Sequence, residues 1–146
     1  MNFSRIMSLL GILGAFLLTS PAFAAEHKIN AEARIFKPDI LYVQPGDTIN
    51  FTNMTSHNAV SYVTPDGAQP FGEKGKLPGG SFSITLESEG IFGFVCEPHI
   101  GFGMVGVIVV GAPTQAVKDA AMKTATETLE GPFRRLIGKI KKVEVK

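Results

Sequence analysis

Three side chains that bind soft metal ions lie in one short stretch of the chain: Cys96, His99 and Met104, spaced as Cys-x2-His-x4-Met. A second imidazole, His57, lies well upstream. One thiolate, two imidazoles and one thioether are the donors of a blue-copper electron-transfer centre. In such a centre two His and one Cys lie near a trigonal plane, and a Met is a weak axial ligand. The pattern therefore predicts that these four residues bind one copper ion.

The donor types suit a metal that changes oxidation state. Thiolate and thioether favour Cu(I), and imidazole suits both Cu(I) and Cu(II). A geometry between the preferences of the two states lets an electron enter or leave with little rearrangement. Gly101 and Gly103 allow the loop to fold back tightly. Pro98 has no N–H to donate to the sulfur, and fewer hydrogen bonds to the thiolate are one influence on the copper potential.

Two other functions would use some of the same residues. In a thiol enzyme, Cys96 would be the nucleophile and His99 or His57 the base, but Met104 would have no role. A protein that stores or delivers copper or zinc is the second alternative, because Zn²⁺ also accepts Cys and His ligands. We expect an electron carrier and not an enzyme, because the four-ligand set leaves no open position for a substrate. No paired carboxylates or Ser-His-Asp set appear elsewhere in the sequence.

Short apolar runs separated by turn residues surround this motif and predict an all-β body. Residues 29–35 alternate apolar with mostly polar side chains, as in one half-buried strand. Gln44-Pro45-Gly46-Asp47 fits a type II turn, with Gly where φ must be positive. Further runs lie at residues 40–43, 48–53, 58–63, 81–87, 91–95 and 105–110. With no helix between them, these runs predict an antiparallel Greek-key β-sandwich of about eight strands.

The expected strands place the motif at one pole of the sandwich. Cys96 directly follows the run at 91–95, and Met104 directly precedes the run at 105–110. Three of the four expected ligands therefore share one loop between two strands. His57 lies at another junction of loop and strand, from which it can close the site.

In residues 113–146 the apolar side chains recur at the spacing of a helix and no longer at that of a strand. Thr114 can cap a first helix, and Gly131-Pro132 ends it. Residues 133, 136, 137 and 140 are apolar and lie along one face of a second helix. We expect this face to pack on the sandwich. A basic amphipathic helix that contacts a membrane or a partner is the alternative.

Charge and cysteine content narrow the possible functions. The formal net charge of +1 lacks the basic excess typical of nucleic-acid binding, so we expect no nucleic-acid partner. Residues 25–112 carry five Lys and Arg against nine Asp and Glu, whereas residues 113–146 carry eight against four. This split predicts a dipolar surface. The single Cys excludes an intrachain disulfide and any four-cysteine metal site.

Residues 1–24 have the layout of a secretory signal peptide. Arg5 gives a positive start, residues 6–18 are almost wholly apolar, and Ala22 and Ala24 are the small residues before a cut. A membrane anchor is the weaker alternative, because the apolar run is short against the ~20 residues that span a bilayer. We predict cleavage after Ala24, with cleavage after Ala25 as the alternative. The remaining chain, residues 25–146, is then one domain with a β-sandwich at 25–112 and a helical tail at 113–146, without membrane insertion.

The chain resembles the cupredoxins, and most specifically the pseudoazurins. Plastocyanins share the Cys-x2-His-x4-Met loop, but they typically have Tyr before the Cys, where this chain has Val95, and they lack a helical tail. Amicyanins have a shorter loop between His and Met. The resemblance covers residues 25–146 and rests on the two-helix tail and on Phe36-Lys37-Pro38, Pro45-Gly46-Asp47, Ser56-His57-Asn58 and Cys96-x-Pro-His99-x4-Met104.

The resemblance implies a periplasmic, monomeric carrier with one type 1 copper ion, held by His57, Cys96, His99 and Met104. Such a carrier shuttles single electrons between redox proteins, for which a copper nitrite reductase or a c-type cytochrome are the implied partners. A plastocyanin-like carrier is the alternative within the same class. The resemblance also implies that Asn58 ties the ligand loops together and that its backbone N–H reaches the thiolate.

His99 is, by the same resemblance, the ligand at the solvent edge, within an apolar patch to which Pro98, Ile100 and Phe102 contribute. We expect Arg34 to stack on the His99 imidazole. Pseudoazurins generally surround this patch with lysines, and only Lys37, Lys74 and Lys76 of the body could do so here. A strongly acidic partner is therefore less well matched to this chain.

Overall fold

The structure is a computed structural model and describes residues 23–145. The predicted signal peptide therefore lies outside the described residues except for its last two. These two, Phe23 and Ala24, are exposed and have no regular secondary structure. The predicted sandwich and tail fall within the described part of the chain, apart from the final residue.

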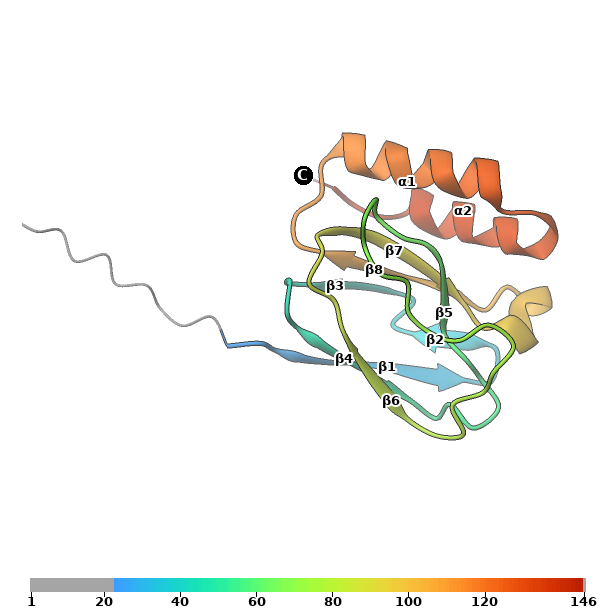
Figure 1. The fold of residues 1–146 in the computed structure, drawn as a ribbon. Coiled ribbons are helices and arrows are strands. Elements are labelled where there is room, and N and C mark those ends of the chain that lie inside the picture. Colours follow the sequence, from blue (N-terminus) through green and yellow to red (C-terminus); the bar gives the residue numbers. More distant parts are fainter. Residues whose placement is uncertain (1–22, 146) are drawn as a thin grey trace, which may run out of the picture.

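Eight strands form two four-stranded sheets that pack face to face (Figure 1). The first sheet has the order β2-β1-β4-β6, with β1 Glu26–Glu32, β2 Ile35–Lys37, β4 Thr48–Thr52 and β6 Phe82–Thr85. The second has the order β3-β8-β7-β5, with β3 Ile40–Val43, β5 Val60–Val63, β7 Gly90–Val95 and β8 Val105–Val110. The predicted all-β sandwich of about eight strands is confirmed.

The sheets are mixed and not purely antiparallel as predicted. β1 pairs with β4 in parallel, and β3 pairs with β8 in parallel. After the β1–β2 hairpin, the chain crosses to the other sheet as β3 before it returns as β4 beside β1. A strand that returns after such a crossover can run in the same direction as its new neighbour. Alternation of side chains cannot reveal this, because it is the same in parallel and antiparallel pairs.

The prediction of one strand through residues 29–35 was wrong. The chain turns at Ala33 and Arg34, and Glu32 pairs with Ile35 across the hairpin. Ala33 has a φ of 51°, a left-handed conformation that Ala rarely adopts and that no sequence signal indicated. Ile35 consequently lies 49% exposed at the end of the sheet and not in the core.

Two apolar clusters hold the layers together. Aromatic rings fill the space between the sheets, where Phe36 lies 4.8 Å from Phe94 and Phe51 stacks 4.8 Å from Phe82, centroid to centroid. The second cluster lies between the outer face of the β7–β8 sheet and the tail. The ligand loop joins β7 to β8, so its base lies between the two clusters and is fixed by both.

Two helices of the tail cover that outer face (Figure 1). α1 spans Gln115–Thr128, and after a single 3-10 turn at Gly131–Arg134 α2 spans Arg135–Lys141. Leu136 and Ile140 are fully buried, so the prediction that the second helix packs on the sandwich is confirmed. The Leu136 side chain packs directly on Gly93. A Cβ atom added to Gly93 would lie only 2.8 Å from Leu136 Cδ2, so this position has no room for a side chain.

The start of α1 is only partly as predicted. Thr114 does precede its first turn and accepts the Lys118 N–H with its carbonyl, but its side chain makes no capping hydrogen bond. Within the described residues, no helix is both long and apolar enough to cross a membrane.

Candidate metal centre

The ligand loop leaves β7 and returns into β8 through a 3-10 turn at Glu97–Phe102. Val95 pairs with Val105 in the antiparallel register, and the Cys96 N–H donates to the Met104 carbonyl at 2.9 Å. Gly103 reverses the chain at a φ of 87°, where a side chain would be strained. The sheet register therefore fixes Cys96 and Met104 opposite one another at the pole of the sandwich.

Three of the four predicted ligands come together. Cys96 Sγ lies 3.6 Å from His57 Nδ1 and 3.4 Å from His99 Nδ1, and the three ligand atoms all lie within 4.8 Å of one another. Nitrogen and sulfur ligands bind Zn²⁺, an ion similar to copper, at ~2.0–2.3 Å. Three such donors in a trigonal plane around one ion are separated from each other by roughly 3.5–4 Å. The spacing of these atoms therefore fits one metal ion between them.

Met104 belongs to the same buried cluster as Cys96, and both are 0% exposed. Its carbonyl accepts the Cys96 N–H, so Met104 lies next to one of the three clustered donors. A soft donor set of this composition, shielded from water, suits copper and not a hard ion such as Mg²⁺.

The electrostatics of the centre favour neutral imidazole and oppose a free thiolate. Burial lowers the pKa of His57, and the nearby His99 lowers it further. Burial also raises the pKa of the Cys96 thiol, although hydrogen bonds from the backbone N–H groups of Asn58 and His99 act in the opposite direction. A buried thiol whose pKa is raised is a poor free nucleophile, which weakens the thiol-enzyme alternative.

Asn58 joins the two ligand loops through its side chain, as the resemblance implied. Its Oδ1 accepts the Glu97 N–H at 2.8 Å, and its Nδ2 donates to Glu97 Oε2 at 2.8 Å and to the Lys76 carbonyl at 3.1 Å. Asn58 is only 3% exposed. This one amide therefore ties the residue after His57 to the residue after Cys96.

Glu97 was not singled out by the sequence, yet its carboxylate accepts hydrogen bonds from three donors. Besides Asn58, it accepts the Tyr62 hydroxyl at 2.7 Å and the Gly75 N–H at 2.7 Å, and Lys74 contributes positive charge. Burial raises the pKa of Glu97, but the hydrogen bonds and Lys74 outweigh it, so the pKa lies below its ordinary value. Burial and the Glu97 contact raise the pKa of Tyr62 to about 12.

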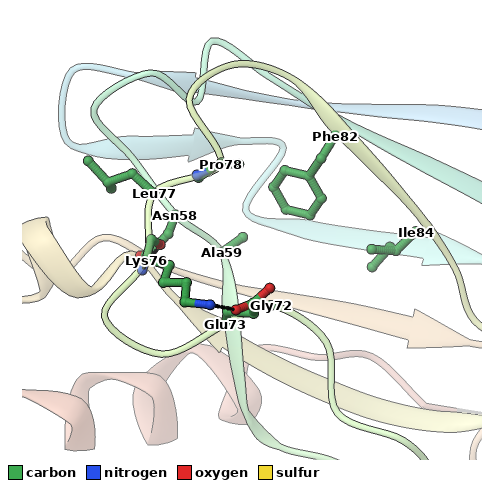
Figure 2. Close-up of a pocket in the computed structure, with 9 residues that line it drawn as sticks. All are labelled: Asn58, Ala59, Gly72, Glu73, Lys76, Leu77, Pro78, Phe82 and Ile84. Carbon is green, nitrogen blue, oxygen red and sulfur yellow. Dashed lines mark hydrogen bonds and ion pairs between the residues drawn. The ribbon is translucent and has the colours of Figure 1, made fainter.

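A surface pocket lies on the other side of Asn58 (Figure 2). The loop at residues 72–78 forms one wall, and Phe82 and Ile84 of β6 form the opposite wall. None of the three clustered donors lines this pocket. The Lys76 carbonyl accepts a hydrogen bond from Asn58, so the loop that lines the pocket also contacts the residue next to His57.

The solvent edge of the centre differs in part from expectation. His99 is half-buried whereas His57 is 5% exposed, so His99 is the outer of the two imidazoles. Phe102 is 57% exposed and its ring lies 6.4 Å from that of His99, as expected for a surface patch. Ile100 was wrongly assigned to the patch. It is 8% exposed and packs with the helical tail.

The expected stacking of Arg34 on the His99 ring is also wrong. The Arg34 guanidinium lies over Phe102, 3.8 Å from the ring centroid. The flat face of a phenyl ring attracts a cation. Arg34 thus places a positive charge on the Phe102 ring of the patch.

The three lysines that could surround the patch, Lys37, Lys74 and Lys76, contact other groups. Lys37 pairs with Glu32 at 2.6 Å, Lys76 pairs with Glu73, and Lys74 lies 4.6 Å above the Tyr62 ring. The surface around Phe102 therefore has two guanidinium groups, with Arg34 over the ring and Arg135 against the neighbouring Gly103.

Comparison with known proteins agrees with this fold and site. The family model "Copper binding proteins, plastocyanin/azurin family" matches residues 23–111. A pseudoazurin of Paracoccus pantotrophus is 37% identical over 132 residues, which covers 82% of this chain and 89% of that protein. A plastocyanin of Prochlorothrix hollandica is 35% identical over 121 residues, covering 75% and 92%. The crystal structure of native pseudoazurin from Hyphomicrobium denitrificans matches with a TM-score of 0.63 and 31% identity, over 82% of this chain and 99% of that one.

The chain belongs to the plastocyanin/azurin family of copper-binding proteins, the cupredoxins. It is a blue-copper electron-transfer protein with one copper ion per chain. Within the family it is of the pseudoazurin type. The family model ends at residue 111, before the helices, whereas the pseudoazurin structures cover 80% and 82% of this chain and so include part of the tail.

Proposed function

We propose that this protein is an exported, monomeric carrier that shuttles single electrons between redox proteins in the periplasm, with His57, Cys96, His99 and Met104 as its copper ligands. The observation that carries the proposal is the convergence of Cys96 Sγ, His57 Nδ1 and His99 Nδ1 within 4.8 Å, beside a buried Met104. The leader sequence supports export. A buried, metal-bound Cys96 also explains how an exported chain keeps one unpaired thiol in an oxidising compartment.

The bound copper ion supplies the redox couple, Cu(II)/Cu(I), and the chain supplies fixed donors and a route for the electron. Two sheets, the helical tail and the Asn58–Glu97 contacts hold the donor atoms in place, so little has to move when the charge changes. Burial of Cys96 and Met104 excludes water from the donors. His99 is the outer imidazole, so the electron passes through its ring and the patch at Pro98 and Phe102.

The proposed partners are redox proteins that dock on this patch, such as a copper nitrite reductase or a c-type cytochrome. The patch is apolar around Phe102, with the Arg34 guanidinium stacked on it. We expect the contact to be chiefly apolar, with charge-assisted bonds from Arg34 and the neighbouring Arg135 only, and weak dependence on ionic strength. A partner that needs a wide ring of lysines would not match.

Electron self-exchange tests this assignment with the protein alone, because two copies must bring their outer imidazoles together. We expect Phe102→Asp to lower the self-exchange rate measured by NMR line broadening at least ~10-fold, since each encounter would place two carboxylates in an apolar contact. Val117→Asp is the matched control: Val117 is also an exposed apolar residue, but it lies on α1. Equal rates in the two variants would contradict the docking surface.

Electrochemistry separates a carrier from a protein that delivers copper. Copper-loaded protein should cycle reversibly between Cu(II) and Cu(I) and keep its metal after repeated cycles and dialysis. Loss of the metal in the reduced state would favour the delivery alternative.

A further inference from the structure

One buried carboxylate that the copper site does not use holds the turn between β3 and β4. Asp47 ends the type II turn before β4 and is 5% exposed. Its Oδ2 accepts the Gln44 N–H at 2.8 Å and lies 2.8 Å from His27 Nε2. Its Oδ1 accepts the backbone N–H of Ala25 at 2.8 Å. Donors from two distant segments of the chain thus converge on one side chain.

Ala25 is fixed through both its nitrogen and its carbonyl. Its N–H donates to Asp47 Oδ1, and its carbonyl accepts the Thr48 N–H at 2.9 Å, next to the parallel pairing of β1 with β4. The residue two positions earlier, Phe23, is 89% exposed. Within the described residues, the contacts that order the chain therefore begin at Ala25, the residue that removal of residues 1–24 would leave first.

We propose that the processed chain begins at Ala25 and that its new α-ammonium group binds Asp47 as an ion pair. This inference rests on the export and cleavage proposed above. Water hydrolyses the Ala24–Ala25 peptide bond, which leaves a carboxylate on Ala24 and an ammonium group on Ala25. The nitrogen is already in place: the Asp47 carboxylate accepts its N–H now, and the ammonium group adds a positive charge on the donor side of that bond. Cleavage after Ala25 would remove both fixed contacts.

The surroundings of this nitrogen favour a cation. Asp47 stays charged at ordinary pH, because the Gln44 and Ala25 N–H groups and the His27 side chain lower its pKa to about 2. The turn itself is held from the other side by the Gly46 N–H, which donates to the Leu86 carbonyl at 3.0 Å. The other titratable groups on the segments around the turn are His27, Glu26 and Lys28 of β1 and Glu87 beside Gly46.

The pH dependence follows from the direction of the shift. An amino group beside a buried carboxylate has a folded pKa above its unfolded value of ~7.7–8.0. The ion pair therefore stabilises the fold fully below about pH 7.7, and this contribution is lost as the pH rises through the folded pKa.

The test uses the full chain, expressed with its leader, exported and purified with copper bound. Intact mass gives the first residue, and ¹³C NMR of that residue against pH gives the pKa of its amino group. We expect a chain that begins at Ala25 and an amino pKa above the ordinary range of ~7.7–8.0. Asp47→Asn should return the value to that range, and Glu87→Gln should leave it raised.

A second variant keeps Asp47 intact in case Asp47→Asn fails to fold. One Ala inserted between Ala24 and Ala25 moves the amino group a residue away from Asp47. This variant should show an ordinary amino pKa, and it should melt below the parent at pH 7 but not at pH 10. An ordinary pKa in the parent, or a chain that begins at Glu26, overturns the inference and leaves export intact. Retention of residues 1–24 would contradict export as well.

Discussion

Replacement of Asn58 by Ala tests whether one buried amide holds the two ligand loops together. The variant loses two hydrogen bonds with uncharged groups, from the Glu97 N–H and to the Lys76 carbonyl, and one with the Glu97 carboxylate. Neutral bonds contribute about 0.5–1.5 kcal/mol each, and bonds to a charged group about 1.5–3 kcal/mol. Because Glu97 is only half-buried, we take the lower part of these ranges and expect a loss of about 3 kcal/mol.

The assay is urea unfolding of the copper-free and the copper-loaded protein. A loss of about 3 kcal/mol is large against the ~5–15 kcal/mol stability of a typical domain, but it leaves most such proteins folded. Tyr62→Phe removes one donor from the same carboxylate, at a more exposed position, and should cost about 1 kcal/mol. Asn50→Ala is the matched control, because its side-chain bonds are exposed.

The three variants should therefore rank with Asn58→Ala as the least stable and Asn50→Ala near the parent. We also expect Asn58→Ala to gain less stability from copper than the parent, because its ligand loops are no longer held in position before the metal binds. An unfolding free energy for Asn58→Ala within about 1 kcal/mol of the parent would refute the role assigned to the amide. So would a loss no larger than that of Tyr62→Phe.

Three more predictions concern the tail, the axial ligand and pH. Leu136→Ala should lower the unfolding free energy by about 2–5 kcal/mol, because it opens a cavity over Gly93, yet the visible spectrum of the copper-loaded variant should be unchanged. Met104→Leu should raise the copper potential in voltammetry, because a hydrocarbon side chain in place of the thioether leaves a less polar site that disfavours the more highly charged Cu(II); an unchanged potential would contradict the axial role. Tyr62 should ionise near pH 12 in ultraviolet titration, and its contribution to stability should be lost between about pH 10 and 12, a loss absent in Tyr62→Phe.

The parts of the fold that could be predicted are those that local sequence determines. Residues 40–43 and 105–110 are strands with the predicted bounds, because each is an unbroken apolar run between turn residues. The turn at Pro45–Gly46 was predictable because Gly46 has a φ of 87°, which few other residues adopt. The ligand loop was predictable because its donor types and spacing suit one metal chemistry.

The parts that could not be predicted depend on contacts between distant segments. Parallel pairing of β1 with β4 leaves no mark on the alternation of either strand. Burial of Ile100 depends on where the helical tail docks. Glu97 and Tyr62 look like ordinary surface residues in the sequence, and only the fold brings the hydroxyl within 2.7 Å of the carboxylate.

The measurement that tests the central claim most directly is the visible absorption spectrum of the processed protein as Cu(II) is added. We predict an intense blue band that reaches its maximum at one copper ion per chain, bleaches with ascorbate and returns on oxidation. The same titration of Cys96→Ser should give no such band, because the thiolate is its source. A colourless parent protein whose Cys96 thiol still reacts freely after copper is added would contradict the account.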